Sequence, residues 1–174
     1  MSAFTHPADG AAASPRVIEL KRRIDYDAAV AGERSDEFVD LDLTRLAVPT
    51  ALAKWEADRQ VDVISDSETL LDLRLKHDQQ VVTMRVSLFS AATPRHRVAE
   101  RLIARADAVT TVHISDVRGP RDLGTLSLTP GSGGTVYWVY RNVYAEVIVF
   151  QSPVDKLAVA RDMQAQFEAA LRRR

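Results

Sequence analysis

A strict alternation of hydrophobic and polar residues marks two neighbouring strands between residues 71 and 88. In the first strand every second residue is apolar: Leu71, Leu73 and Leu75. In the second strand the apolar residues recur with the same spacing: Val82, Met84, Val86 and Leu88. A period of two buries one face of a strand and leaves the other face in water. With Asp78 and Gln79 between the two runs, the pattern predicts an antiparallel hairpin.

Apolar residues spaced three and four positions apart predict helices on either side of this hairpin. Residues 48–60 carry Pro49, which suits a first helical turn. Their apolar residues fall on one helical face: Ala51, Leu52 and Trp55. A second helix is expected to start at Thr93 and Pro94. Its apolar stripe is formed by Val98, Leu102, Ile103 and Ala106.

The strongest helical pattern covers residues 152–174. Ser152 is expected to cap this helix, Pro153 to begin it, and Arg172 to Arg174 to lie at its C-terminal end. For residues 16–30 the sequence permits either a helix or a strand. Val17, Leu20 and Ile24 have helical spacing, whereas the run RIDYD alternates like a strand.

Shorter apolar runs predict further strands at residues 61–65, 111–115 and 125–128, followed by a turn in the run TPGSGG. The resulting order is helix, two or three strands, helix, three strands, helix. This order predicts an α+β fold, in which an antiparallel sheet of about five to six strands has its helices packed on one face. We expect residues 1–15 to be a disordered tail, 16–48 an N-terminal arm and 49–174 a single domain.

The segment TVYWVYRNVYAEVIVF, residues 135–150, is rich in aromatic side chains: Tyr137, Trp138, Tyr140 and Tyr144. It exceeds a usual strand in length, so we expect a turn at Arg141 and Asn142, because asparagine tolerates a positive φ. One face of the hairpin would then carry Tyr137, Val139, Tyr144 and Glu146. The other face would carry Trp138, Tyr140, Val143 and Ala145. If helices cover only one face, one aromatic pair lies at or near the surface.

Two interpretations of that aromatic pair remain open. Aromatic residues suit strands and stabilise cross-strand pairs, so the cluster can be ordinary sheet. Aromatic residues are also enriched at the centres of protein interfaces, so an exposed pair can instead bind a partner, a second copy or a ligand.

The composition bounds the function. The 174 residues are 46% hydrophobic and 27% charged, in the range of ordinary globular domains, and the net charge of −1 gives no global field that favours nucleic acid. The absence of cysteine excludes disulfides, thiolate metal sites and a cysteine nucleophile. We find no signal-peptide pattern and no apolar run of about 20 residues, so a cytoplasmic protein without a membrane span is expected.

No arrangement of residues points to catalysis, a metal or a cofactor. The four histidines (His6, His77, His96 and His113) are scattered and lack metal-ligand spacing. The run GSGG at 131–134 lacks the strand–loop–helix context of a phosphate loop. Among the acids, Glu146 is the one flanked by apolar strand residues, which makes it the candidate for a raised pKa. A strand glutamate facing solvent is the plainer interpretation.

The order of elements over residues 49–171 resembles that of type III secretion chaperones and similar small dimeric α+β modules. The resemblance is one of topology alone, and it implies binding of extended segments of other proteins. We therefore expect a non-catalytic protein-interaction module, chaperone-like, adaptor-like or an assembly subunit, homodimeric and using the aromatic hairpin face. The expected binding residues are Tyr137, Trp138, Tyr140, Arg141, Tyr144 and Glu146. The alternative is a small-ligand-binding domain or enzyme, with Trp138 or Tyr140 and Glu146 lining a pocket between sheet and helices.

Overall fold

The computed structural model describes residues 13–32, 36–108, 119–129 and 133–173. Six strands form one antiparallel sheet in the order β2-β3-β4-β7-β6-β5, and β1 pairs with β8 in a separate two-stranded sheet. The α+β class is thereby confirmed. The elements are α1 (Pro15–Arg23), α2 (Tyr26–Gly32), β1 (Glu37–Val39), the 3-10 turns η1 (Leu43–Arg45) and η2 (Thr50–Leu52), β2 (Glu56–Ser65), β3 (Glu68–His77), β4 (Gln80–Phe89), α3 (Arg95–Ala108), β5 (Leu126–Leu128), β6 (Thr135–Tyr140), β7 (Val143–Phe150), α4 (Lys156–Ala169) and β8 (Leu171–Arg173).

The central hairpin forms as its alternation predicts. Strands β3 and β4 pair from Glu68–Phe89 to His77–Gln80, and the turn between them holds Asp78 at a φ of 53°. Aspartate is one of the residues that adopt this left-handed conformation most readily. The leucines of β3 and the apolar residues of β4 are completely buried: Leu71, Leu73, Leu75, Val82, Met84 and Val86.

The aromatic segment forms the expected second hairpin, β6–β7, with its turn at Arg141 and Asn142. Tyr140 pairs with Val143 across this two-residue turn. The positive φ, 55°, belongs to Arg141 and not to Asn142. The amide of Asn142 instead accepts a hydrogen bond from the N–H of Val39 (2.7 Å) and donates to the carbonyls of Val39 (3.1 Å) and Phe89 (2.7 Å). The asparagine therefore ties β1 to the sheet.

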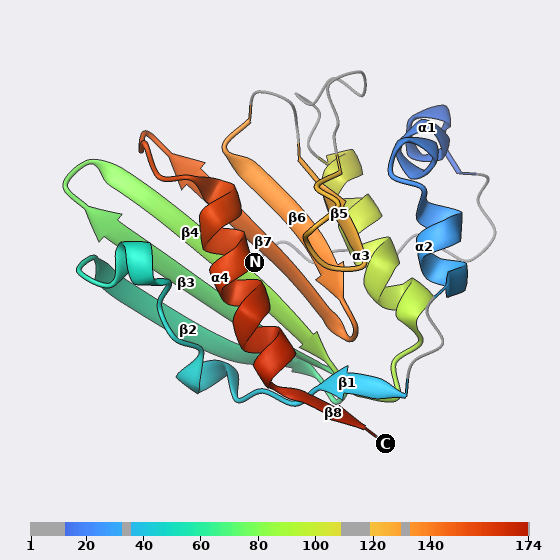
Figure 1. Ribbon diagram of the computed structural model, residues 1–174, viewed down its shortest axis with the longest axis horizontal. Coiled ribbons are helices and arrows are strands. Elements are labelled where there is room, and N and C mark those ends of the chain that lie inside the picture. Colours follow the sequence, from blue (N-terminus) through green and yellow to red (C-terminus); the bar gives the residue numbers. More distant parts are fainter. Residues whose placement is uncertain (1–12, 33–35, 109–118, 130–132, 174) are drawn as a thin grey trace.

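The helices lie on both faces of the sheet, whereas the sequence suggested one (Figure 1). Successive residues of a strand point to opposite faces. Trp138 packs with α4, and its neighbour Tyr137 belongs to the core beneath α3. We call these the α4 face and the α3 face. The segment from β1 to η2 also packs on the α4 face, and α1 and α2 pack on α3.

Helix coverage of the α3 face is incomplete. Helix α3 lies over β6 and β7, and the core on this face holds no buried residue of β2, β3 or β4. Those three strands instead present polar or half-buried residues there, including Asp58, Gln60, Asp72 and Arg85. We call the α3 face of β2, β3 and β4 the open face. The name means that none of the described helices covers most of it.

Three segments differ from the sequence-based expectation. Residues 48–60 form the single turn η2 and then the first half of β2, and not a helix. Helix α4 begins at Lys156 with Asp155 as its N-cap, because the Asp155 carboxylate accepts from the N–H of Leu157 (2.8 Å), so Ser152 is not the cap. Arg172 and Arg173 belong to β8 and do not extend the helix.

The N-terminal arm resolves as helical where the sequence left a choice. Helix α1 starts at Pro15, and Ser14 caps it by accepting from the N–H of Val17 (3.2 Å). The strand expected at 111–115 lies outside the described residues, as do residues 1–12 of the expected tail. The boundary expected at residue 48, between the N-terminal arm and the single domain, stays a prediction. Among the helices described, none is long and apolar enough to cross a membrane.

Candidate functional site

The aromatic residues of the β6–β7 hairpin are core residues. Tyr137, Trp138 and Tyr144 are between 0% and 4% exposed, and Tyr140 is half-buried. The faces of the hairpin divide these residues as expected, with Tyr137 paired to Glu146 and Trp138 to Ala145. The expectation of an exposed aromatic pair is nevertheless wrong, because α3 covers one face and α4 the other. A role of these residues in binding stays a prediction.

Trp138 anchors α4 to the sheet. Its indole Nε1 donates to Oε1 of Gln164 at 3.0 Å, and its ring stacks on Phe167 with centroids 6.2 Å apart. At the turn, Arg141 donates to the Glu37 carboxylate at 2.9 Å and lies over the ring of Tyr140, 5.6 Å from its centroid. These contacts hold elements of the fold together.

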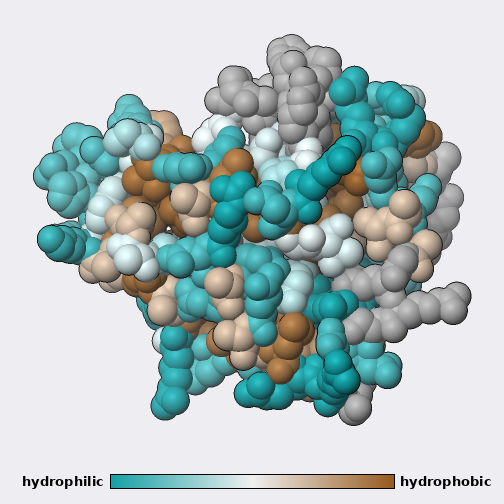
Figure 2. Space-filling model, viewed as in Figure 1, coloured by the Kyte–Doolittle hydropathy of each residue, from teal (hydrophilic) through white to brown (hydrophobic). Residues whose placement is uncertain are grey.

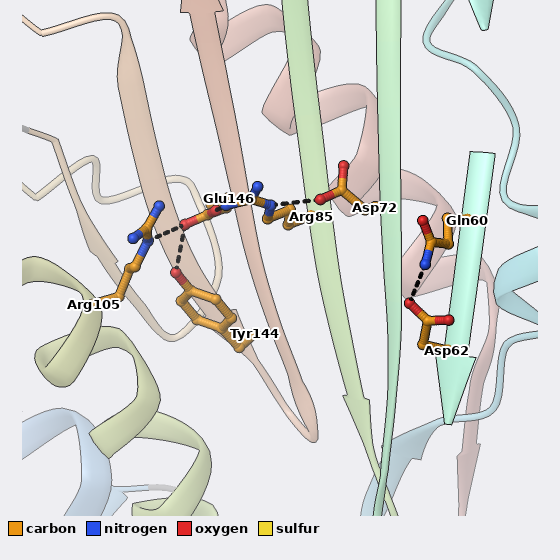
Figure 3. Close-up of polar contacts among 7 residues, drawn as sticks. All are labelled: Gln60, Asp62, Asp72, Arg85, Arg105, Tyr144 and Glu146. Atoms are coloured by element: carbon orange, nitrogen blue, oxygen red, sulfur yellow. Dashed lines mark hydrogen bonds and ion pairs between the residues drawn. The ribbon is translucent and has the colours of Figure 1, made fainter. Parts of the chain in front are cut away.

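Glu146 is the centre of a charged row that crosses the sheet on the α3 face (Figure 3). Its carboxylate is buried, with 2% of the side chain exposed. It accepts from the Tyr144 hydroxyl at 2.9 Å, from Nε of Arg105 on α3 at 3.0 Å, and from a terminal nitrogen of Arg85 at 3.3 Å. Arg85 then donates through Nε to Asp72 at 2.8 Å. The row therefore spans β7, β4 and β3 and ends on the open face.

The electrostatics of this row fix its charge states. Partial burial lowers the pKa of Arg85, but the hydrogen bond and charge of Asp72, with Glu146, raise it overall. Burial also lowers the pKa of Arg105, but the charge and hydrogen bond of Glu146 raise it by more. Burial first, and then the Glu146 charge, raises the pKa of Tyr144 well above its usual value. The guanidinium groups stay charged and the phenol stays neutral.

The row joins β3, β4, β7 and α3 through hydrogen bonds and ion pairs. Two carboxylates face two guanidinium groups, so the formal charges of the row balance. Trp138 and Glu146 lie on opposite faces of the sheet, so the expected pocket lined by both does not form. Among the described residues, no group of three metal-binding side chains comes together.

Two hollows of the described surface lie away from this row. One, of about 320 Å³, lies between the end of α1 and residues 119–127, and another, of about 210 Å³, lies between β1 and residues 91–95. Seen from the α4 side, hydrophilic and hydrophobic atoms are intermixed and form no single large apolar patch (Figure 2). Neither observation indicates an enclosed ligand site.

Strand β2 is the long outer edge of the six-stranded sheet, and its second side has no partner strand among the described residues. The N–H of Ser90 donates to the carbonyl of Ser67 at 2.8 Å, which makes that pair a hydrogen-bonded pair of the β3–β4 ladder. Because such pairs alternate, odd-numbered residues of β3 bond to β4 and even-numbered residues bond to β2. The β2 residues whose N–H and C=O point outward are therefore Ala57, Arg59, Val61 and Val63.

The side chains of β2 differ between its two faces. On the open face it presents a mostly acidic row: Glu56, Asp58, Gln60 and Asp62, all exposed. On the α4 face, Arg59 turns inward and donates to the carbonyls of Leu43 (2.9 Å) and Leu46 (2.5 Å). At the far end, Val63 is 78% exposed and Ile64 51%, next to a bulge between Val63 and Ser65.

Sequence reasoning missed β2 as a site. On the α4 face of β2, the apolar residues Ala57, Val61 and Val63 are interrupted by Arg59. An apolar residue at position 59 would have completed the alternation that marks a strand. The sequence predicted only the second half of this strand, at residues 61–65, and the signal that could have extended the prediction is the acidic alternation at 56, 58 and 62.

Comparison with known proteins adds no assignment. The chain matches no protein family, no curated protein and no solved structure.

Proposed function

We propose that this protein is a non-catalytic protein-interaction module, chaperone-like or adaptor-like, that binds an extended segment of another protein along β2. The supporting observation is the edge of β2, ten residues long, with backbone donors and acceptors that point away from the sheet. A partner that adds itself as a strand satisfies these groups, and the main-chain hydrogen bonds supply affinity.

The length of the edge supports this use. Natural proteins usually shorten or cover edge strands, because long exposed edges invite pairing with other chains. In β2, eight residues are exposed, and only Arg59 and Val61 are half-buried. The opposite edge of the sheet, β5, has three residues, all of them buried. Of the two edge strands described in the six-stranded sheet, β2 is thus the long and exposed one.

The charges of β2 argue against a second copy of this chain at this edge. An antiparallel self-pairing centred on Gln60 would bring Asp58 opposite Asp62 of the other copy, and one centred on Arg59 would oppose Glu56 to Asp62. Like charges directly opposite each other are destabilising. A self-pairing centred on Val61 would run into the bulge after Val63. The homodimer that the sequence suggested would therefore use another surface, and the partner at β2 is a different chain.

This proposal moves the binding surface away from the hairpin. The aromatic residues expected to bind are packed under α3 and α4, so reaching them would require a helix to move. Strand β2 needs no such rearrangement, because its outward groups are already at the surface.

The test is selection of peptides followed by mapping. A library of random twelve-residue peptides is selected on the full-length protein, and the enriched peptides are added while amide hydrogen exchange is measured. We expect new protection at the outward amides of residues 57 to 63. No enriched peptide, or protection confined to other elements, would refute the proposal.

A pair of variants checks the mechanism of binding. Proline at positions 57 and 63 removes two outward N–H donors but no bond of the β2–β3 ladder, so Ala57→Pro/Val63→Pro should keep its fold and lose most peptide affinity. The control Ala57→Ser/Val63→Thr keeps both donors and should bind normally. Circular dichroism and thermal unfolding verify the fold of each variant. Equal binding by both variants would exclude strand addition.

A further inference from the structure

The acidic row of β2 specifies the chemistry of the segment that pairs with it. We infer, on the basis of the proposed strand addition, that the partner segment is basic and carries lysine or arginine at alternate positions that face Glu56, Asp58 and Asp62. The remaining positions of the segment, on its other side, are small or apolar.

The geometry of the ladder brings the opposing side chains close together. The outward backbone groups belong to the odd-numbered residues, so these form the hydrogen-bonded pairs with an added strand. The even-numbered residues then form the non-hydrogen-bonded pairs, in which the Cα atoms are only about 4.5 Å apart. The acidic residues of β2 occupy these closer pairs, where a side chain of opposite charge gives the largest effect.

The carboxylates of the row are available to a partner. Glu56, Asp58 and Asp62 are exposed, and none of them forms an ion pair in the part of the chain described. Asp62 accepts a hydrogen bond from the side-chain amide of Gln60, at 2.8 Å (Figure 3).

The neighbouring strand offsets the charge of the row only at one end. Lys76 and Arg74 lie opposite Glu56 and Asp58 on β3, but Leu70 lies opposite Asp62, and Asp72 is engaged by Arg85. The acidic end of the row at Asp62 therefore has no basic neighbour on β3, and a basic side chain of an added strand would meet it directly.

The α4-face positions of β2 define the other side of the segment. Ala57 and Val61 leave room for small or apolar side chains, and Val63 offers an exposed apolar surface. Arg59 is occupied by the carbonyls of Leu43 and Leu46, so it does not seek an acidic partner. An alternating basic and apolar strand matches both sides at once, and an acidic segment matches neither.

The test uses four nine-residue peptides labelled with fluorescein. One alternates lysine with valine, the second replaces lysine by glutamine, and the third replaces it by glutamate. The fourth has the composition of the first, with the lysines and valines in blocks that cannot put all charges on one side of a strand. Fluorescence anisotropy gives the affinity, and hydrogen exchange locates the bound peptide on the protein.

Matched variants report on the acidic row itself. Asp58→Asn/Asp62→Asn removes two opposing charges, and Asp36→Asn/Asp66→Asn removes two exposed acids outside the ladder for the same change in net charge. Each cross-strand charge pair changes affinity by up to about fivefold. We expect the first variant to bind the lysine peptide about tenfold more weakly, and the control to bind it nearly as the natural protein does.

The outcomes separate this inference from the proposed function. Preference for the alternating lysine peptide, protection at β2 and loss in the row variant alone would support it. Equal binding of the lysine, glutamine and glutamate peptides at β2 would overturn the charge assignment and leave strand addition standing. Equal loss in both variants, or equal binding of the block peptide, would reduce the effect to net charge and overturn the inference. Failure of the lysine peptide to protect β2 would also overturn it, whereas strand addition itself is judged by the selected library peptides.

Discussion

Replacing Glu146 by glutamine should destabilise the fold without touching the edge of β2. The substitution keeps the size of the side chain and removes its charge. The Glu146 carboxylate, 2% exposed, holds three donors at once, from Tyr144, Arg105 and Arg85. A glutamine whose oxygen takes the place of Oε2 can still accept from Tyr144 and Arg105, but its amide group then faces the guanidinium of Arg85, which is itself a donor.

The structure sets the size of the loss. Breaking a fully buried ion pair by removing one partner costs about 3–5 kcal/mol. The side chains of Arg105 and Arg85 are 32% and 40% exposed, so water can solvate the guanidinium groups that the substitution releases. Arg85 also keeps its bond to Asp72. We therefore expect Glu146→Gln to lower the free energy of unfolding by about 2–3 kcal/mol. For a chain of this size, that corresponds to a fall in Tm of about 4–12 °C.

Urea denaturation followed by circular dichroism measures this difference, and Asp122→Asn is the control. Asp122 also pairs with an arginine, Arg161, at 2.7 Å, but its side chain is 60% exposed, so its loss should destabilise the fold far less than the loss of the buried Glu146 charge. A loss below about 1 kcal/mol for Glu146→Gln, or a loss equal to that of Asp122→Asn, would refute the structural role of the charged row. A variant that keeps its stability but no longer binds selected peptides would instead assign Glu146 to recognition.

Two further predictions concern the aromatic residues. Burial raises the pKa of all four tyrosines above 10, so phenolate absorbance should rise together with unfolding and not near pH 10 in the folded protein. Because the pKa is higher in the folded than in the unfolded state, the resulting stabilisation is complete below pH 10 and is lost as the pH rises above it. A native protein with half of its tyrosines ionised at pH 10 would contradict their burial. Trp138→Ala should cost about 3–5 kcal/mol in urea denaturation, and Tyr140→Ala, at a half-buried position, at most about 2 kcal/mol. A folded Trp138→Ala protein that lost only partner binding would restore the hairpin as the interface.

The hairpins could be predicted because their signals are local. The leucines at 71, 73 and 75 alternate without a break, and no other structure buries them all on one side. In the second hairpin, the length of the segment and a turn-forming residue near its middle were enough to give the register, although the left-handed conformation is taken by Arg141 and not by Asn142.

The candidate site could not be predicted, because it depends on which face each helix covers. Residues 95–108 and 156–169 both have apolar faces, and nothing in their sequences states that they pack on opposite sides of one sheet. That arrangement packs the aromatic residues into the core and leaves much of the α3 face of β2 to β4 without a helix among the described residues. Residues 48–60 were misread because Ala51, Leu52 and Trp55 imitate a helical face in a segment that is part turn and part strand.

The pairing of β1 with β8 has a consequence for the order in which the protein is made. Val39 pairs with Leu171, and its backbone is also held by the side chain of Asn142, so both partners of β1 are synthesised long after β1 itself. During translation β1 leaves the ribosome before either of its partners has been made. It stays accessible to chaperones and proteases until β7 and β8 have emerged, and its docking is therefore among the last steps by which the newly made chain reaches its native structure.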